Sequence, residues 1–347
     1  MPANPLAAVR RPLGRIRRKI GRVLAGVGEA PAILMYHRVA APRHDPWALC
    51  VTPDRFARQL EALKASRTLL PLDELVELLE ASRAPPRATA ITFDDGYADN
   101  ALVAKPLLEQ AGVPATIFLT SGFVGADGPF WWDELAGLVL GSERAARVEI
   151  EVGGVALAAS WPADDRGDKP VKAPWRGWER PRTARQAAFQ NLWRALQHMD
   201  DTLRSQAMAA VRASLSDGDA GPSHGDLPMS AELAAALPSA FITVGGHGRT
   251  HAPLPSLPAT AHDDEIAGGR SDLTRLTGRA PSGFAYPHGR WDGASRAAVA
   301  RAGYAWAVTS RPALVDPRRY DRYALPRMAV TDVEPAELMN AIATLGV

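Results

Sequence analysis

The chain has 347 residues, of which 40 are basic and 38 acidic, and 46% of its residues are hydrophobic. This size allows one large α/β domain or two ordinary ones, and the composition excludes wholesale disorder. The net charge of +2 gives no reason to expect a nucleic-acid partner, and no apolar run approaches the ~20 residues that cross a bilayer. The single cysteine, Cys50, excludes an internal disulfide and fits a reducing compartment, and we expect it to be a small buried residue.

Charge is uneven only at the N-terminus. Seven basic side chains and no acidic one precede Glu29, which sets residues 1–28 apart as a basic segment. Because its charges interrupt any apolar stretch, it does not resemble a secretory signal, and we predict a cytoplasmic protein. Four apolar residues within 10–24 share one helical face: Leu13, Ile16, Ile20 and Leu24. This pattern predicts either a helix lying on the inner face of an anionic membrane or a solvated leader.

Short apolar runs alternate with amphipathic helices after this segment. We expect strands over 33–36, 68–70, 88–93 and 115–120, and helices over 53–66, 73–81 and 98–111. The first strand ends at His37, and the third ends at Asp94-Asp95-Gly96. Strands and helices in this alternation predict an α/β fold with a mainly parallel sheet or barrel.

The alternation breaks over residues 127–228. Apolar helical patterns occur at 131–140 and 183–215, and a hairpin is expected around Gly153-Gly154. We interpret this block as a largely helical insertion into one domain that spans 29–347. The block is rich in tryptophan, and we single out four of these residues: Trp131, Trp132, Trp175 and Trp178. Two interpretations stay open for these side chains, namely stacking on sugar rings and packing in a core.

The alternation resumes after the block. We expect strands over 241–244, 284–287 and 304–309, an apolar segment over 323–330, and helices over 261–276, over 294–302 and from Pro335. The chain shows no internal repeat.

Three polar clusters directly follow apolar runs: Asp94-Asp95-Gly96, His247 to His251, and Pro287 to Arg290. In α/β folds the carboxyl ends of strands are where catalytic residues gather. Two histidines and one aspartate match a catalytic zinc set with an open position for water, and Mn²⁺, Co²⁺ and Fe²⁺ stay open as alternatives. A second carboxylate beside the metal could take the proton of that water, and Gly96 allows the sharp turn that brings both carboxylates into one site.

These motifs resemble those of a known family. The string Thr92-Phe93-Asp94-Asp95-Gly96 resembles the first signature of the polysaccharide deacetylases, also called the NodB-homology family. The pair His247 and His251 resembles the second signature, and the run from Phe284 to Gly289 resembles the third. The run from Met35 to Val39 is similar to a segment at the start of the branch that deacetylates exported or surface polysaccharides.

The resemblance implies a fold, a reaction and residue roles. It implies a distorted (β/α) barrel of about seven strands that hydrolyses acetyl groups of a carbohydrate. It implies a divalent metal, with Zn²⁺ the first expectation, and three ligands for it: Asp95, His247 and His251. Asp94 would then be the general base, and the backbone N–H of His288 would help to hold the oxyanion. Trp306 would line the pocket for the acetyl methyl group.

The sequence also departs from the family pattern. Gly248 stands where a serine or threonine usually follows the first ligand histidine, and the arginine that usually opens the third signature is missing. We therefore expect Arg327 to orient the base from another strand. No histidine follows His288, so the late general acid of many members is absent as well. We assign that role to His37; the alternative is that His37 only hydrogen-bonds to the first strand.

The sequence thus predicts a metal-dependent deacetylase in exopolysaccharide biosynthesis. The substrate would be an acetylated carbohydrate, N-acetylated or O-acetylated, as a polysaccharide or as an oligosaccharide or lipid-linked precursor. Two alternatives stay open: a hydrolase of the same fold that acts on a small non-sugar amide, and a non-catalytic carbohydrate-binding scaffold. The sequence does not specify the sugar or the oligomeric state.

Overall fold

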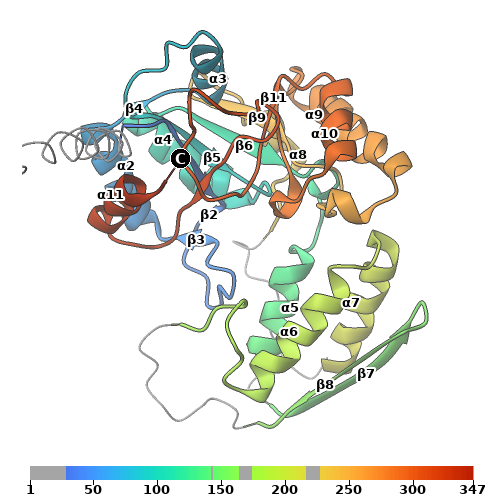
Figure 1. The fold of residues 1–347 in the computed structure, drawn as a ribbon. Coiled ribbons are helices and arrows are strands. Elements are labelled where there is room, and N and C mark those ends of the chain that lie inside the picture. Colours follow the sequence, from blue (N-terminus) through green and yellow to red (C-terminus); the bar gives the residue numbers. More distant parts are fainter. Residues whose placement is uncertain (1–28, 142–143, 164–173, 216–226, 347) are drawn as a thin grey trace, which may run out of the picture.

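The computed structural model describes residues 29–141, 144–163, 174–215 and 227–346. These residues form a curled parallel sheet ringed by helices and, below it in Figure 1, a smaller unit of helices and one hairpin. The basic segment 1–28, with the membrane helix expected within it, lies outside the described residues. Within the described part of the chain, no helix is both long and apolar enough to cross a membrane.

The main sheet is parallel at every strand pairing. Its strands follow the order β11-β10-β9-β6-β5-β1-β12, and β4 pairs with β5 beside this path. The strands are β1 (Ala32–Tyr36), β4 (Thr68–Leu69), β5 (Ala88–Phe93), β6 (Ala115–Leu119), β9 (Ile242–Gly246), β10 (Gly283–Ala285), β11 (Trp306–Val308) and β12 (Met328–Ala329). Most are short apolar runs buried on both faces, as a parallel sheet covered by helices requires. This sheet confirms the α/β fold and the distorted barrel that the sequence predicts.

One short segment near the C-terminus joins the two edges of the sheet. Leu325 pairs with Val308 of β11, and Met328 pairs with Leu34 of β1. The segment therefore lies between β1 and β11 and narrows the gap between these two strands of the barrel. Arg327 lies between these two pairing points, and its side chain is only 1% exposed.

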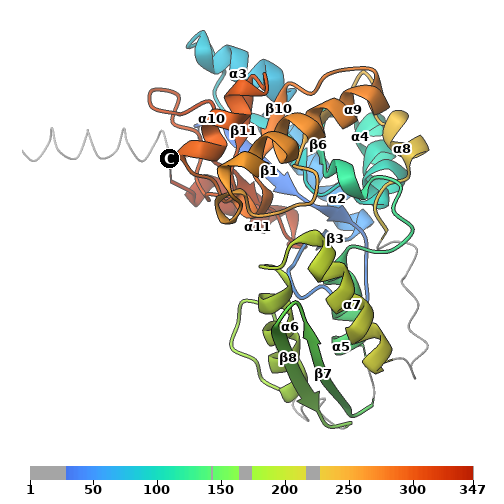
Figure 2. The ribbon, with the colours of Figure 1, turned by 90° about the vertical axis from the view of Figure 1, so that its right-hand side faces the viewer.

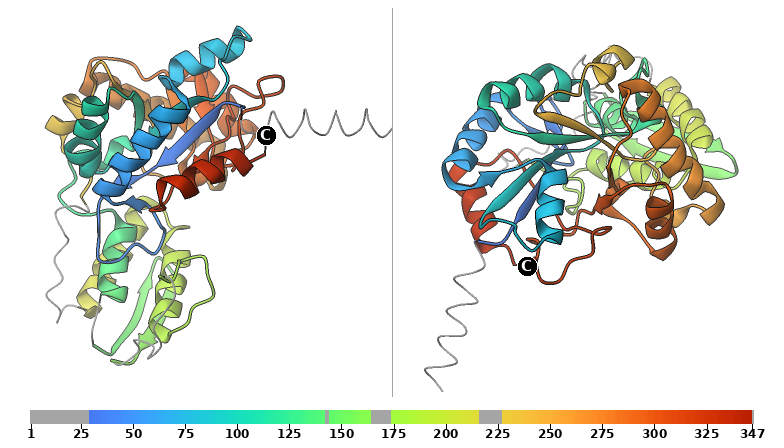
Figure 3. Two further views of the ribbon diagram at one scale, coloured as in Figure 1. Left: turned by 90° about the vertical axis from the view of Figure 1, so that its left-hand side faces the viewer. Right: turned by 90° about the horizontal axis from the view of Figure 1, so that it is seen from above.

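Alternate residues of the strands face two different cores, because successive side chains of a strand point to opposite faces. The inner cluster contains Ile33, Ala90, Phe118 and Ala285, together with the buried leucines of α3 (Leu72–Glu80). The outer clusters lie on the convex face of the sheet. The view from above in Figure 3 shows the helices that surround the sheet on this side. These helices are α2 (Pro53–Ser66), α4 (Lys105–Ala111), α8 (Ala231–Ala235), α9 (Gly269–Thr277), α10 (Gly293–Arg301) and α11 (Pro335–Thr344).

Three local features differ from the expectations. The helix expected over 98–111 begins as a π-helical turn, Asn100–Ala104, and continues as α4, which ends at Gly112 in the left-handed conformation. The apolar segment 323–330 contributes only the two residues of β12. A small parallel sheet of β2 (Arg38–Val39) and β3 (Cys50–Val51) was not predicted, because two-residue strands have no periodic pattern. Cys50 itself is buried and free, as expected.

The smaller unit has its own hydrophobic core. It consists of α5 (Trp131–Leu140), β7 (Ala146–Val152), β8 (Val155–Trp161), α6 (Ala184–Leu196) and α7 (Asp201–Leu215). The strands β7 and β8 form an antiparallel hairpin, and both glycines of its turn, Gly153 and Gly154, have positive φ. Leu135, Phe189 and Val211 belong to a cluster within this unit. Figure 2 shows the three helices and the hairpin of the unit lying together.

This unit leaves the sheet between two neighbouring strands. β6 and β9 pair directly, with Ala115 opposite Ile242, although the whole unit separates them in sequence. The chain therefore returns to the sheet beside the strand from which it left. On this ground we propose that residues 127–228 are an insertion into one α/β domain.

Candidate metal centre

The polar clusters of the sequence meet at one edge of the barrel. Asp94 and Asp95 follow β5, His247 follows β9, and His288 follows β10. Since all these strands are parallel, their carboxyl ends lie at the same edge. The side chains that the sequence separates by more than 150 residues therefore line a single cavity of about 430 Å³.

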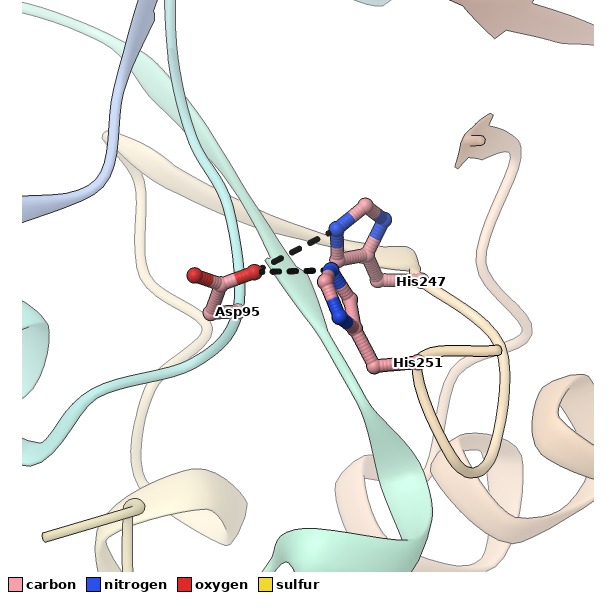
Figure 4. A group of neighbouring side chains, drawn as sticks. All are labelled: Asp95, His247 and His251. Carbon is pink, nitrogen blue, oxygen red and sulfur yellow. Dashed lines mark ion pairs between the residues drawn. The ribbon is translucent and has the colours of Figure 1, made fainter. Parts of the chain in front are cut away.

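Asp95, His247 and His251 point toward one another (Figure 4). The Nε2 atoms of His247 and His251 lie 3.4 and 3.3 Å from Oδ1 of Asp95. Two ligands at ~2.1 Å from a tetrahedral ion lie ~3.4 Å apart, so these spacings fit a shared divalent cation. Imidazole nitrogen and carboxylate oxygen are also a donor set suited to such ions. The three residues thus form a candidate divalent-metal site.

Each of the two histidines has a feature that suits it to bind a cation. Nδ1 of His247 lies 2.8 Å from the carbonyl oxygen of Ala285, which can only accept, so the proton sits on Nδ1 and Nε2 is left for a metal. Burial and the neighbouring imidazole of His288 hold the pKa of His251 well below its usual value. A neutral ring is the form that coordinates a cation.

The backbone of the site is held in uncommon conformations. Asp95, His251 and His288 have φ values of 74°, 58° and 55°, in the left-handed region that side chains rarely adopt. Each such residue costs ~1–3 kcal/mol and persists only where its surroundings enforce it. This strain aims the carboxylate and imidazoles into the cavity rather than along the strands.

Glu265 braces the loop that carries the two histidines. Its buried carboxylate accepts hydrogen bonds from the backbone N–H groups of Arg249 (2.8 Å) and Thr250 (3.1 Å) and from the Thr250 hydroxyl (2.7 Å). Gly248, at φ 75°, leaves room for this carboxylate: a Cβ there would lie 3.0 Å from Glu265 Oε2. A carboxylate from the helical turn Asp264–Gly268 therefore braces the loop at the position where Gly248 replaces the expected hydroxyl residue. No local pattern in the sequence predicts this role of Glu265.

Asp94 is paired with Arg327 in a buried bidentate ion pair. Nη1 and Nη2 of Arg327 lie 2.7 and 2.6 Å from the two carboxylate oxygens. Further bonds from the guanidinium to the Thr309 carbonyl oxygen (2.9 Å) and the Thr92 hydroxyl (3.0 Å) fix its orientation. Burial alone would raise the pKa of Asp94, but the Arg327 charge outweighs it and lowers the pKa to about 2. The carboxylate is therefore ionised near neutral pH and held beside the metal ligands.

The structure also places the remaining residues singled out by the sequence. His37 lines the cavity, and its carbonyl oxygen accepts a bond of 2.8 Å from Asn100 Nδ2. The ring of His288 lies 4.4 Å from that of His251, and burial lowers its pKa to about 4. Trp306 does not line the cavity, so that expectation is wrong: its indole N–H donates to Asp73 at 2.7 Å, and its ring packs in the inner core. Trp306 is the first residue of β11 and pairs with Gly283, the first residue of β10, so its side chain enters the inner core at the end of the strands opposite the site.

The far wall of the cavity is aromatic. It contains Trp131 and Trp132 at the start of α5, Trp193 of α6, Trp178 of the loop before α6, and Trp47. Sequence reasoning missed Trp47 and Trp193, which lie in segments that carry no catalytic motif. Trp175, by contrast, packs in the core of the insertion.

A short hydrogen-bond chain ties this wall to the loop that follows β5. The Tyr97 hydroxyl donates to Asp133 at 2.6 Å and accepts from the Trp132 indole N–H at 2.7 Å. The Trp132 ring in turn lies 5.0 Å from the ring of His251. The insertion is therefore fastened to the loop that presents Asp94 and Asp95.

A parallel barrel with this ligand set and an ionised carboxylate beside it is typical of metal-dependent hydrolases. The family model described as polysaccharide deacetylase matches residues 81–150 and 217–307. YxkH of Bacillus subtilis, described as a polysaccharide deacetylase, is 33% identical over 102 residues, which are 28% of this chain and 35% of that protein. The match thus spans about a third of that relative. The chain belongs to the polysaccharide deacetylase family.

Solved structures share the fold. The Streptococcus pyogenes deacetylase PplD, solved in complex with acetate, aligns with a TM-score of 0.52 and 16% identity, over 90% of this chain and 98% of that one. IcaB from Ammonifex degensii aligns with a TM-score of 0.56 and 17% identity, over 91% of this chain and 98% of that one. The family model includes the three metal-ligand candidates, Asp94 and His288, whereas His37 and Arg327 lie outside it.

Proposed function

We propose that this protein is a metal-dependent deacetylase that hydrolyses N-acetyl groups of a polysaccharide, or of its oligosaccharide or lipid-linked precursor. The observation that carries the proposal is the ionised Asp94 carboxylate, held by Arg327 next to the Asp95, His247 and His251 cluster. An O-acetyl ester offers the same carbonyl chemistry and is the second substrate to test.

Each residue has a defined part in the proposed reaction. Asp95, His247 and His251 would hold a divalent ion, with Zn²⁺ the first expectation, and this ion would act as a Lewis acid toward the acetyl carbonyl and lower the pKa of a water molecule. The Asp94 carboxylate takes the proton of the attacking water. Arg327 orients Asp94 and keeps it ionised, which makes Arg327 a positioning residue.

Two further groups complete the reaction. The backbone N–H of His288 donates to the oxygen on which negative charge develops. The amine that leaves the carbonyl carbon needs a proton, and we assign His37 to supply it because its side chain lines the same cavity. The products are acetate and the free amino sugar.

The test measures metal content and acetate release from a pool of N-acetylated oligosaccharides. Wild type and Asp94→Asn should both bind about one metal ion, and only wild type should release acetate. The matched control is Asp263→Asn, since Asp263 also belongs to a pair of adjacent aspartates but is 69% exposed at the surface; it should behave as wild type. Metal without acetate release would direct the search to small amides. A folded protein that binds no metal even with added zinc would refute the mechanism and favour a scaffold.

A further inference from the structure

The loop before α6 displays a large apolar side chain to solvent. Trp178 is 64% exposed, more than any other large hydrophobic residue among the described ones, and it lines the mouth of the catalytic cavity. A single exposed apolar side chain is common, but Trp178 belongs to the aromatic lining of the cavity, and a contiguous apolar surface of this kind usually marks a binding site.

This exposure does not come from a loose loop. The buried side chain of Gln190 donates its two amide hydrogens to the carbonyl oxygens of Gly177 and Glu179, at 2.7 Å each, on either side of Trp178. The N–H of Gly177 donates to Pro46 at 2.6 Å. A Cβ on Gly177 would lie 2.6 Å from the ring of Trp47, so only glycine allows this close approach. The loop is therefore braced from both sides while its tryptophan stays exposed.

A continuous series of aromatic rings leads from this region to the metal-ligand candidates. The ring centroids of Trp47 and Trp193 are 4.4 Å apart, and those of Trp193 and Trp131 are 6.2 Å apart. Trp131 lies 5.6 Å from Trp132, which contacts His251. The metal-ligand candidates thus share their cavity with an aromatic wall, and the insertion contributes most of the rings of that wall.

The charge of the cavity is confined to one end. The Asp and Arg side chains that line it are Asp94, Asp95 and Arg327, and all three belong to the catalytic cluster. The aromatic wall offers flat apolar faces and no formal charge. Such faces suit the C–H side of a neutral sugar ring, with the ring's hydroxyls directed to water.

We propose that Trp178, with the aromatic wall behind it, binds a sugar ring that adjoins the acetylated one, so that the protein selects an oligosaccharide or polymer over a single sugar. This inference rests on the proposed deacetylase function, because the acetyl group must reach the metal ligands while the next ring lies on the wall. Trp178 is then a specificity-determining residue and takes no part in the chemistry.

The test compares substrates of different length. Acetate release is measured from N-acetylglucosamine and from its β-1,4-linked di- and tetrasaccharide, for wild type, Trp178→Ala and Trp178→Phe. We expect wild-type kcat/KM to rise with length. Trp178→Ala should lose about tenfold on the tetrasaccharide through KM, with kcat and the monosaccharide rate unchanged. Trp178→Phe should retain most of the gain. Equal losses on all lengths, or none, would overturn the proposal.

The matched control is Trp291→Ala. Trp291 is also an exposed tryptophan, at 40%, but it stacks on Tyr286 and does not line the cavity. We expect it to leave the dependence on substrate length as in wild type. If it abolishes that dependence as Trp178→Ala does, the effect is not specific to the wall and the proposal fails.

A binding measurement separates the failure of this inference from the failure of the proposed function. Calorimetric titration of the tetrasaccharide into metal-loaded Asp94→Asn needs no hydrolysis. About tenfold weaker binding of the Asp94→Asn, Trp178→Ala double variant supports the sugar subsite even if wild type releases no acetate. Equal binding by both proteins overturns the subsite even if wild type is an active deacetylase. Loss of affinity for an alkyl chain but not for the tetrasaccharide would also overturn it, and would assign the wall to a lipid.

Discussion

Removal of the Arg327 side-chain charge tests how the site is held together. In Arg327→Met, Asp94 keeps its negative charge but loses both guanidinium hydrogen bonds, in a place where burial disfavours that charge. The Thr309 carbonyl and the Thr92 hydroxyl lose their partner as well. Breaking a buried pair from one side is costly because the remaining charge is left without compensation.

The size of the effect follows from the pKa of Asp94. The fall from its ordinary value of 3.8 to about 2 corresponds to about 2–3 kcal/mol of stabilisation at neutral pH. The unpaired Thr309 carbonyl and Thr92 hydroxyl and the uncompensated Asp94 charge add to this cost. We therefore expect Arg327→Met to lower the free energy of unfolding by about 3–5 kcal/mol. The double variant Asp94→Asn, Arg327→Met removes both charges, so it should be more stable than Arg327→Met by about 2 kcal/mol or more.

The sign of the pH dependence provides a second measurement. In wild type the folded-state pKa of Asp94 is depressed, so the pair's contribution is complete above about pH 4 and is lost as the pH falls toward 2. Without Arg327, burial raises that pKa instead. The Arg327→Met variant should therefore be closer to wild type in stability at pH 4 than at pH 7.

The assay is urea unfolding followed by circular dichroism, with chelator present so that metal binding does not contribute. The matched control is Arg296→Met, because Arg296 forms a bidentate pair with Asp321 at 2.7 and 2.9 Å but is 40% exposed. That surface pair should be worth less than about 1 kcal/mol. A loss below 1 kcal/mol in Arg327→Met, or a double variant no more stable than it, would refute this account of the pair.

Three further variants probe the metal site and its supports. His251→Ala leaves two ligands, so we expect loss of stoichiometric zinc after dialysis; retained zinc would exclude this ligand set. Glu265→Gln weakens the brace on Thr250 and should reduce zinc affinity about 10–100-fold in a chelator competition, whereas unchanged affinity would contradict the brace. Gly289→Ala, at φ 64°, places a Cβ 1.8 Å from the Ser310 hydroxyl, and should lower kcat/KM about 100-fold; near-normal activity would argue against such tight packing.

The strand ends could be predicted from the sequence because their signals are local. Apolar runs that stop at Asp94-Asp95-Gly96 and shortly before His247 identify both the strands and the chemistry that follows them. Parallel strands then bring these ends to one edge, so a fold class was enough to predict that the aspartates and histidines meet. Because the third signature lacks its usual arginine, we expect Arg327 to orient Asp94 from another strand. The structure places the Arg327 guanidinium beside the Asp94 carboxylate.

Other parts of the site depend on contacts between segments with no local pattern in common. Glu265 braces the histidine loop, and Gln190 braces the loop of Trp178, yet neither belongs to a motif. Trp193 lines the cavity while Trp175 is packed in the insertion's core, and no motif around either residue predicts this difference.

The sequence by itself therefore determined the strand-end chemistry and the class of fold, since hydrophobic periodicity and turn residues act over a few positions. The tertiary structure alone decided which tryptophans of the insertion face the catalytic edge and which carboxylate supports the metal loop. Those outcomes depend on how the insertion packs where β6 and β9 adjoin, and the place of Trp306 at the start of β11 likewise puts its ring in the inner core. Packing of this kind is a property of the whole chain.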